Sequence, residues 1–102
     1  MSRGGNNLRS YELMTIHRPE LAEDEMRSKV SAVEKFLGEQ GATVSTTDVW
    51  GKRRFAYEID HLNEGYYTVF NFLADPGTVA ELDRMLSLAD EVVRHKIFRP
   101  ES

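Results

Sequence analysis

Histidine is the side chain most often used for acid–base catalysis and metal binding, and the three histidines here suit neither. His17, His61 and His95 are scattered, and no two have the spacing that places metal ligands on one helix face. Asp60 adjoins His61, but neighbours on a strand point to opposite faces and cannot cooperate. The glycines form no phosphate-binding loop, and the absence of cysteine removes thiolate chemistry and disulfides. We therefore predict that the protein is not an enzyme and uses no metal or cofactor.

Binding chemistry is better represented, first by the run Lys52-Arg53-Arg54. This run lies between the aromatic residues Trp50 and Phe55, and Tyr57 follows. On a strand, alternation would send Lys52 and Arg54 to one face and Arg53 to the other. The run suits contacts with RNA phosphates, but edge strands also carry lysine and arginine simply to discourage aggregation. Both interpretations stay open on this evidence.

A second basic stretch lies close to the end of the chain. Residues 92–100 contain no acidic residue and include Arg94, Lys96 and Arg99. If Val93 and Ile97 face the core, Arg94 and Lys96 project from the opposite face of the strand. We also expect Arg9, just before the first strand, to join Arg94 and Lys96 in one patch. An ordinary solvated strand face remains the alternative.

The distribution of charge supports a binding surface although the net charge is −4. Acidic residues concentrate in two segments, 19–41 and 75–91. Outside these segments the chain holds six acidic and nine basic residues. Negative and positive charges are therefore segregated along the sequence, although the net charge alone does not show this.

The two acidic segments have the periodicity of helices, and four others resemble strands. Pro19 suits a helix start, and an apolar stripe follows at three- and four-residue spacing: Ala22, Met26, Val30, Val33 and Leu37. Asp75 and Pro76 suit the start of the second helix. Apolar, β-branched and aromatic residues predict strands over residues 11–17, 43–59, 66–74 and 92–98, with a loop over 61–65.

The resulting order β-α-β-β-α-β predicts an α+β, ferredoxin-like split β-α-β fold. In it, a four-stranded antiparallel sheet carries both helices on one face. We expect residues 1–9 to form a flexible arm and residues 10–100 a single domain. Gly51 leaves two possibilities for the second strand: a tight turn between two short strands, or a glycine bulge in one long strand. No apolar segment is long enough to predict a membrane span.

Residues 48–59, Asp-Val-Trp-Gly-Lys-Arg-Arg-Phe-Ala-Tyr-Glu-Ile, resemble the central signature of the family of the sixth small-subunit ribosomal protein of bacteria. Supporting motifs occur in the expected order over about residues 10–100: Tyr11-Glu12-Leu13 before Pro19, Gly65-Tyr66-Tyr67, Leu82-Asp83-Arg84, and Val93 to Ile97. The resemblance implies a ferredoxin-like fold whose second strand is long, bent and projecting. It also implies a cytoplasmic, ribosome-associated protein that binds the central region of small-subunit ribosomal RNA with ribosomal protein eighteen.

The residues expected at this interface follow from both lines of reasoning. The RNA contacts are predicted to come from Arg9, Lys52, Arg53, Arg54, Arg94, Lys96 and Arg99. Tyr11 and Tyr57 are candidates for stacking or for packing in the core or at its rim. Trp50 would either anchor a protein partner or pack at the sheet edge. No membrane or small-molecule substrate is expected, although a small-molecule-sensing regulatory domain and a small dimeric enzyme share this architecture.

Overall fold

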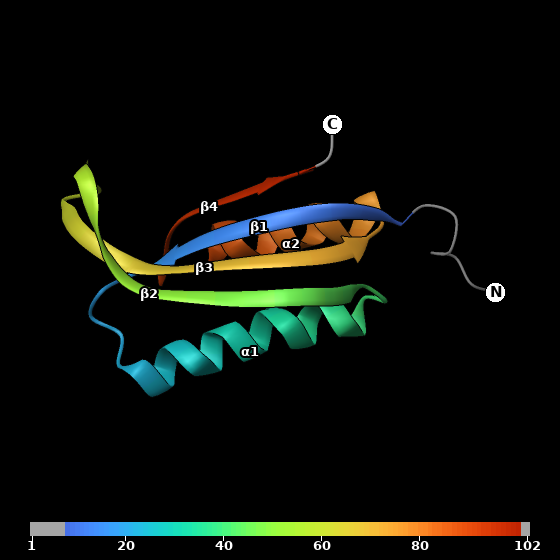
Figure 1. Ribbon diagram of the computed structural model, residues 1–102, viewed down its shortest axis with the longest axis horizontal. Helices are drawn as coiled ribbons and strands as arrows, with labels where there is room; N and C mark the ends of the chain where they lie inside the picture. The colour runs from blue at the N-terminus through green and yellow to red at the C-terminus, as the bar shows by residue number, and fades with distance from the viewer. Residues whose placement is uncertain (1–7, 101–102) are drawn as a thin grey trace.

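A computed structural model describes residues 8–100 and shows two helices on one face of an antiparallel sheet (Figure 1). The elements are β1 (Arg9–His17), α1 (Glu23–Glu39), β2 (Thr43–Ile59), β3 (Leu62–Ala74), α2 (Pro76–Leu88) and β4 (Val92–Phe98). The strand order is β2-β3-β1-β4, and every neighbouring pair is antiparallel. The predicted ferredoxin-like fold is confirmed.

The core lies between the helices and one face of the sheet. The two central strands contribute Leu13, Phe70 and Phe72, which are almost fully buried. The predicted stripe of α1 is buried from Met26 onward, and Leu82 and Leu86 of α2 complete the core. The remaining face of the sheet, here called the open face, carries no helix.

The start of α1 differs from the prediction. Pro19 lies in the turn before the helix, which begins at Glu23, and Ala22 is its exposed N-cap residue. The Ala22 N–H donates to the carboxylate of Glu25 at 2.8 Å, so a side chain satisfies a backbone donor that the helix leaves free. In α2, the Asp75 carboxylate accepts the Thr78 N–H at 2.8 Å, as the sequence predicted.

The predicted loop over residues 61–65 is wrong, because β3 already begins at Leu62. A two-residue turn, Asp60 and His61, connects β2 to β3, with φ values of 51° and 64°. Positive φ at both central positions matches the twist of a tight hairpin, and aspartate and histidine tolerate it better than most residues. The β2–β3 hairpin therefore extends to this turn, with a shift in register between Arg54 and Ile59 (Figure 1).

Gly51 forms a bulge within one continuous β2 strand. Val49 pairs with Thr68 and Gly51 pairs with Tyr67, so Trp50 is the extra residue on β2. Gly51 has a φ of +88°, which glycine adopts without steric cost. The bulge interpretation is confirmed.

The expected N-terminal arm falls mostly on residues 1–7, which lie outside the described residues. Arg9 is the first residue of β1. Among residues 8–100, no helix has the length and apolar character needed to span a membrane.

Candidate nucleic-acid and protein interface

The open face brings together side chains from all four strands. Strand alternation places it opposite Tyr11 and Leu13, which face the helices. The register defines two neighbouring cross-strand rows on this face. The first contains Gly51, Tyr67, Ile16 and Arg94, and the second Asp48, Val69, Met14 and Lys96. Each row runs from the β2 edge to a basic residue on β4.

An aromatic cluster occupies the β2 side of the open face. Trp50 stacks on Tyr67 with ring centroids 5.9 Å apart and planes inclined by 15°. Phe55 meets Tyr67 edge-on at 6.1 Å. The Arg53 guanidinium lies 5.5 Å from the Trp50 ring, and its Nε donates to the Trp50 carbonyl oxygen at 3.4 Å. The indole N–H of Trp50 donates to Asp48 at 3.2 Å, so contacts on several sides fix the indole.

The middle of the open face is apolar although no helix covers it. Ile16 is 3% exposed and Val69 is 8% exposed. They lie in neighbouring rows with Tyr67 and Met14, both partly buried. Sequence reasoning missed Tyr67, Met14, Ile16 and Val69 as residues of the open face. The available signal was the apolar character of both faces of β1 in a sheet with helices on one side only.

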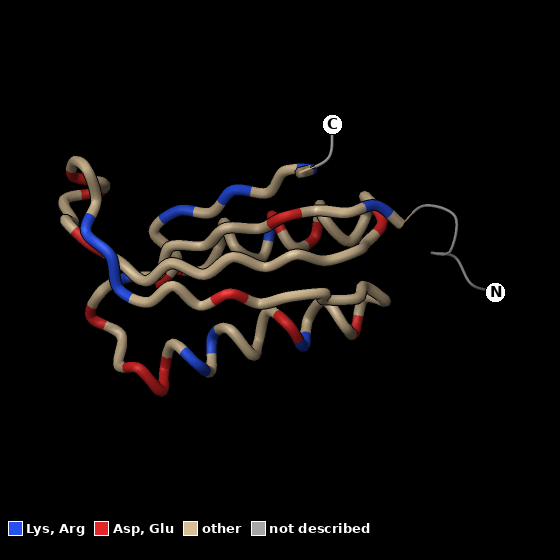
Figure 2. The backbone as a smooth tube through the Cα atoms, in the orientation of Figure 1, with Lys and Arg blue, Asp and Glu red and all other residues tan. Residues whose placement is uncertain are grey.

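The basic run on β2 is divided between the two sides of the hairpin, as alternation predicted. Lys52 Nζ lies 5.2 Å from the ring of Tyr66, which faces the helix side. Arg53 lies over Trp50 on the open face, and Arg54 pairs in register with Glu64. All three basic side chains are exposed. In Figure 2 they form a continuous blue stretch where the β2–β3 hairpin leaves the body of the sheet.

On β4, Arg94 and Lys96 are exposed on the open face, as expected. Ile97 packs against the core on the opposite face, but the expectation for Val93 is wrong. The register shifts between Ile16 and His17, where Val92 pairs with His17, and it is Val92 that packs against the core. His95 faces α2, with Nε2 2.8 Å from a carboxylate oxygen of Asp83.

The expected patch of Arg9 with Arg94 and Lys96 is wrong. Because β1 and β4 are antiparallel, the first residues of β1 lie near the end of β4. Arg94 pairs with Ile16, which lies about 23 Å along β1 from Arg9 at the usual rise per residue. Arg99 follows Phe98, whose partner is Glu12, so Arg99 and Arg9 lie toward the same end of the sheet.

The two candidate stacking tyrosines have different surroundings. Tyr11 is 9% exposed and stacks on Phe72 within the core at a centroid distance of 5.8 Å. This position fits packing and leaves no ring face for a base. Tyr57 is 79% exposed on the projecting part of β2, where its ring can reach a partner.

The basic residues of the interface are not neutralised within the described part of the chain. Its ion pairs are Lys29–Glu91, Arg84–Glu81 and His95–Asp83, and all three involve a helix or the loop beside it. The seven predicted RNA contacts form none among residues 8–100. Figure 2 shows the positive residues of β2 and β4 on opposite edges of the sheet. The open face thus has an apolar and aromatic centre between two basic edges.

The histidines show no catalytic arrangement in residues 8–100. His17 is buried, His61 lies at the hairpin turn, and His95 meets Asp83. Burial lowers the pKa of His17, against a smaller opposing effect from Glu91 and with a further lowering from Lys29. The described residues contain no group of three or more potential metal ligands.

The fold and the open face define a small, ferredoxin-like α+β protein with an uncovered aromatic centre and basic edges. Its family follows from the sequence. A family model described as ribosomal protein S6 matches residues 10–99, so the chain belongs to the ribosomal protein S6 family. Proteins of this family are structural ribosomal components and not enzymes. The predicted family and the non-enzymatic nature of the protein are therefore confirmed.

Relatives and solved structures agree with this assignment. The small ribosomal subunit protein bS6 of Symbiobacterium thermophilum is 46% identical, covering 91% of this chain and 98% of that protein. The bS6 protein of Carboxydothermus hydrogenoformans is 47% identical, with coverage of 92% and 98%. The crystal structure of 30S ribosomal protein S6 from Thermotoga maritima superposes with a TM-score of 0.86 at 35% identity, covering 90% and 87% of the two chains. The predicted cytoplasmic, ribosome-associated location agrees with that of these homologues.

A more distant likeness shows the fold alone. The C-terminal domain of the MgtC protein from Mycobacterium tuberculosis superposes with a TM-score of 0.60 at 18% identity, covering 94% and 92% of the two chains. At such identity the shared fold carries no function. The alternative of a small-molecule-sensing regulatory domain therefore gains no support from it.

Proposed function

We propose that the protein binds the central region of small-subunit ribosomal RNA together with ribosomal protein eighteen of that subunit, and so supports subunit assembly and translation. One observation carries the proposal: the open face presents an apolar and aromatic centre between two basic edges. The family resemblance supplies the identity of the RNA and of the protein partner. The open face provides the apolar centre and the basic edges to which a protein and an RNA can bind.

The centre of the open face is suited to a protein partner. Trp50 is 43% exposed, and its indole is fixed by the contacts with Tyr67, Arg53 and Asp48. Such rigid aromatic side chains dominate the energetics of protein interfaces, since burying them costs little conformational entropy. The partly buried Met14 and Tyr67 continue the apolar surface toward β1. A partner that covers this centre would remove apolar area from water, which is the main driving force of association.

The edges of the open face are suited to RNA phosphates. Arg94 and Lys96 project from β4 and Arg53 projects from β2, while Lys52 and Arg54 lie on the other side of the hairpin. The two edges are three strand spacings apart, which is a distance of about 14 Å. Each basic residue that neutralises a phosphate releases condensed counterions, so affinity rises with the number of such contacts.

The charge balance supports joint binding with a basic partner. A net charge of −4 and a few clustered basic residues provide little attraction for RNA on their own. A basic protein on the open face would add phosphate contacts to those of this chain. We therefore expect weak RNA binding by the isolated chain and much tighter binding by the pair.

The test is quantitative binding to a central-region fragment of small-subunit ribosomal RNA, with and without the partner, over a range of salt concentrations. The pair should bind much more tightly, and the plot of log affinity against log salt should become steeper. Tight binding by the isolated chain with no partner effect would overturn joint binding. Failure of both forms to prefer this RNA over an unrelated RNA of equal length would overturn the RNA assignment.

A further inference from the structure

A third cross-strand row on the open face lies next to the row that contains Met14. It contains Thr46, Asn71, Glu12 and Phe98. Glu12 of β1 and Asn71 of β3 are partners in the register, so their Cβ atoms are about 5 Å apart on this face. Both side chains are partly buried. Two polar side chains therefore lie together on the two central strands, beside the apolar centre.

A hydrogen bond fixes the orientation of Asn71. Its Nδ2 donates to Thr46 Oγ1 of β2 at 3.1 Å. The oxygen of an amide group diverges from its nitrogen, so the Asn71 Oδ1 lies on the side toward β1 and Glu12. This oxygen and the Glu12 carboxylate can only accept hydrogen bonds. The pair thus presents acceptors to any molecule that covers it.

Glu12 has no positively charged partner among residues 8–100. The ion pairs of this part of the chain involve other carboxylates. Lys96 lies in the neighbouring row, on β4, but forms no ion pair with Glu12. The carboxylate is therefore available to a cation from outside the chain.

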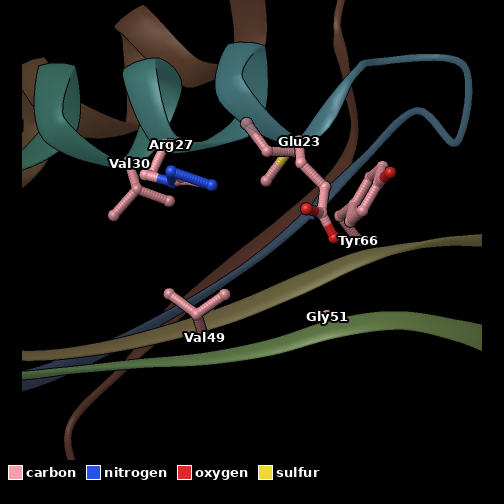
Figure 3. Close-up of a pocket in the computed structure, with 7 residues that line it drawn as sticks. Glu23, Arg27, Val30, Val49, Gly51 and Tyr66 are labelled. Carbon is pink, nitrogen blue, oxygen red and sulfur yellow. The ribbon is translucent and has the colours of Figure 1, made fainter.

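The carboxylate of Glu23 has different surroundings, on the helix side of the sheet. It lies beside a cavity of about 210 Å³ between the first half of α1 and β2, where Val30 and Val49 face each other (Figure 3). Arg27, one turn further along α1, lines the same cavity and carries the opposite charge. Glu23 is therefore a suitable reference for the removal of a carboxylate away from the open face.

A protein that covers the apolar centre also covers Glu12. Glu12 and Met14 are neighbours on the open face of β1, about 7 Å apart along the strand. A standard protein interface covers about 800 Å² on each partner, which is much wider than this separation. A carboxylate that loses contact with water and gains no opposite charge strongly opposes binding. The partner must therefore supply a positive charge at this row.

The surroundings of Glu12 favour arginine over lysine as the source of this charge. A guanidinium group has N–H donors in one plane, so it can bond to the Glu12 carboxylate and to the Asn71 Oδ1 together. Phe98 belongs to the same row and is 43% exposed, and a guanidinium plane stacks on such a ring. The ammonium group of lysine has no plane to stack. A carboxylate, an amide oxygen and an aromatic ring therefore match arginine.

We propose that Glu12, Asn71 and Phe98 form a recognition site for one arginine side chain of the protein partner. This inference rests on the proposed function, because the partner has to bind the open face. The site assigns the third row to protein and not to RNA, since the carboxylate repels phosphates. It also provides specificity, because a partner without a cation at this position would leave Glu12 covered and unpaired.

The test measures the affinity of the full chain for the protein partner by calorimetric titration. Glu12→Gln keeps the shape of the side chain and removes its charge, and it should reduce this affinity about tenfold or more. Glu23→Gln, the matched control on the helix side, should change the affinity less than about twofold. Phe98→Leu should reduce it about threefold, through loss of the stacked ring. An unchanged affinity in Glu12→Gln would overturn the arginine site alone, whereas failure of the unaltered chain to bind the partner would overturn the proposed function and this inference with it.

Variants of the partner identify the residue that Glu12 contacts. Each arginine and lysine of the partner is replaced in turn by glutamine, and each variant is titrated with the unaltered chain and with Glu12→Gln. Replacing one arginine should weaken binding to the unaltered chain about tenfold, but binding to Glu12→Gln less than about twofold. Coupling to a lysine, or to no basic residue, would overturn recognition of arginine.

Two further measurements exclude other roles for Glu12. The effect of Glu12→Gln on partner affinity should persist in a Lys96→Gln background, and its disappearance there would assign the effect to a contact within the chain. RNA binding by the isolated chain should not weaken in Glu12→Gln, and a weakening would assign the row to RNA. Either of these contrary results would overturn the proposal.

Discussion

Trp50 stacks on Tyr67 across the β2–β3 pair, with 5.9 Å between ring centroids and 15° between planes. The bulge at Gly51 brings further side chains to this pair, because it places Trp50 and Gly51 in succession on the open face, so that Arg53 and Phe55 follow on the same face. In a strand of the same sequence without the bulge, Trp50 would still face the open side, but every later side chain on β2, including Arg53, would change face. The bulge therefore determines that Arg53 and Phe55 lie on the same face as Trp50 and Tyr67.

Replacing Trp50 should weaken partner binding far more than it weakens the fold. We expect Trp50→Ala to reduce affinity for the protein partner by about 2 kcal/mol or more, as truncation of a central aromatic anchor does. The free energy of unfolding should fall by much less, since Trp50 is 43% exposed. Calorimetric titration and denaturant unfolding measure the two quantities. Leu88→Ala, at a large apolar side chain that is 72% exposed at the end of α2, is the control; equal losses in both variants would contradict an anchor role for Trp50.

Removing the two basic side chains of β4 should affect assembly and leave stability nearly unchanged. The double variant Arg94→Gln/Lys96→Gln should enter small subunits less efficiently, because two phosphate contacts are lost. In RNA binding by the pair, the salt slope should decrease by about 1.5 to 2. The double variant Arg27→Gln/Lys35→Gln, at two exposed positions of α1, is the charge-matched control. A collapse of the melting temperature in the double variant would show that these residues are structural.

The buried His17 should make stability depend on pH below neutrality. Its pKa in the folded state lies below the ordinary value of 6.5, mainly because burial disfavours the charged ring. Between these two values the unfolded chain binds a proton that the folded chain does not. The free energy of unfolding should therefore fall as the pH drops through 6.5, with a slope of at most about 1.4 kcal/mol per pH unit. It should level off once the pH is below the folded-state pKa.

Urea unfolding at several pH values between 8 and 5 measures this dependence. The variant His17→Asn should lose the slope between pH 7 and the folded-state pKa, whereas His61→Asn, at the exposed hairpin turn, should retain it. The pKa of Glu91 is also lowered, chiefly by a backbone hydrogen bond, so its contribution is lost only at more acidic pH, below about 4.5. A slope that persists in His17→Asn would assign the effect to another group.

Two glycines should respond to alanine in opposite directions. A Cβ at Gly65 would lie 2.7 Å from Ile16 Cγ2 and 2.9 Å from the His17 carbonyl oxygen, so β3 would have to move away from β1. We expect Gly65→Ala to destabilise the fold by about 1–3 kcal/mol, as overpacking does. Gly38 lies in α1, and a Cβ added there would meet nothing within 4 Å, so Gly38→Ala should stabilise by about 0.5–1 kcal/mol. Thermal or denaturant unfolding distinguishes the two, and equal effects would contradict the packing at Gly65.

Much of this protein could be predicted from local patterns in the chain. The apolar stripes from Met26 to Leu37 and from Leu82 to Leu86, and the N-cap Asp75, depend on neighbours within a few residues. The opposite directions of Lys52 and Arg53 follow from strand alternation alone. The family signature over residues 48–59 identified the family without any structure. These features are local, so the sequence determined them.

Tertiary structure decided what depends on pairing between distant segments. The antiparallel register put Arg9 at the end of the sheet away from Arg94, and it placed Tyr11 on Phe72 inside the core. It also stacked Tyr67 on Trp50 and placed His17 beside α1 and α2. Periodicity shows which residues share a face of one strand but not which residues of another strand lie beside them. Register is set by the summed contacts of the whole sheet, so only the folded chain reveals these neighbours.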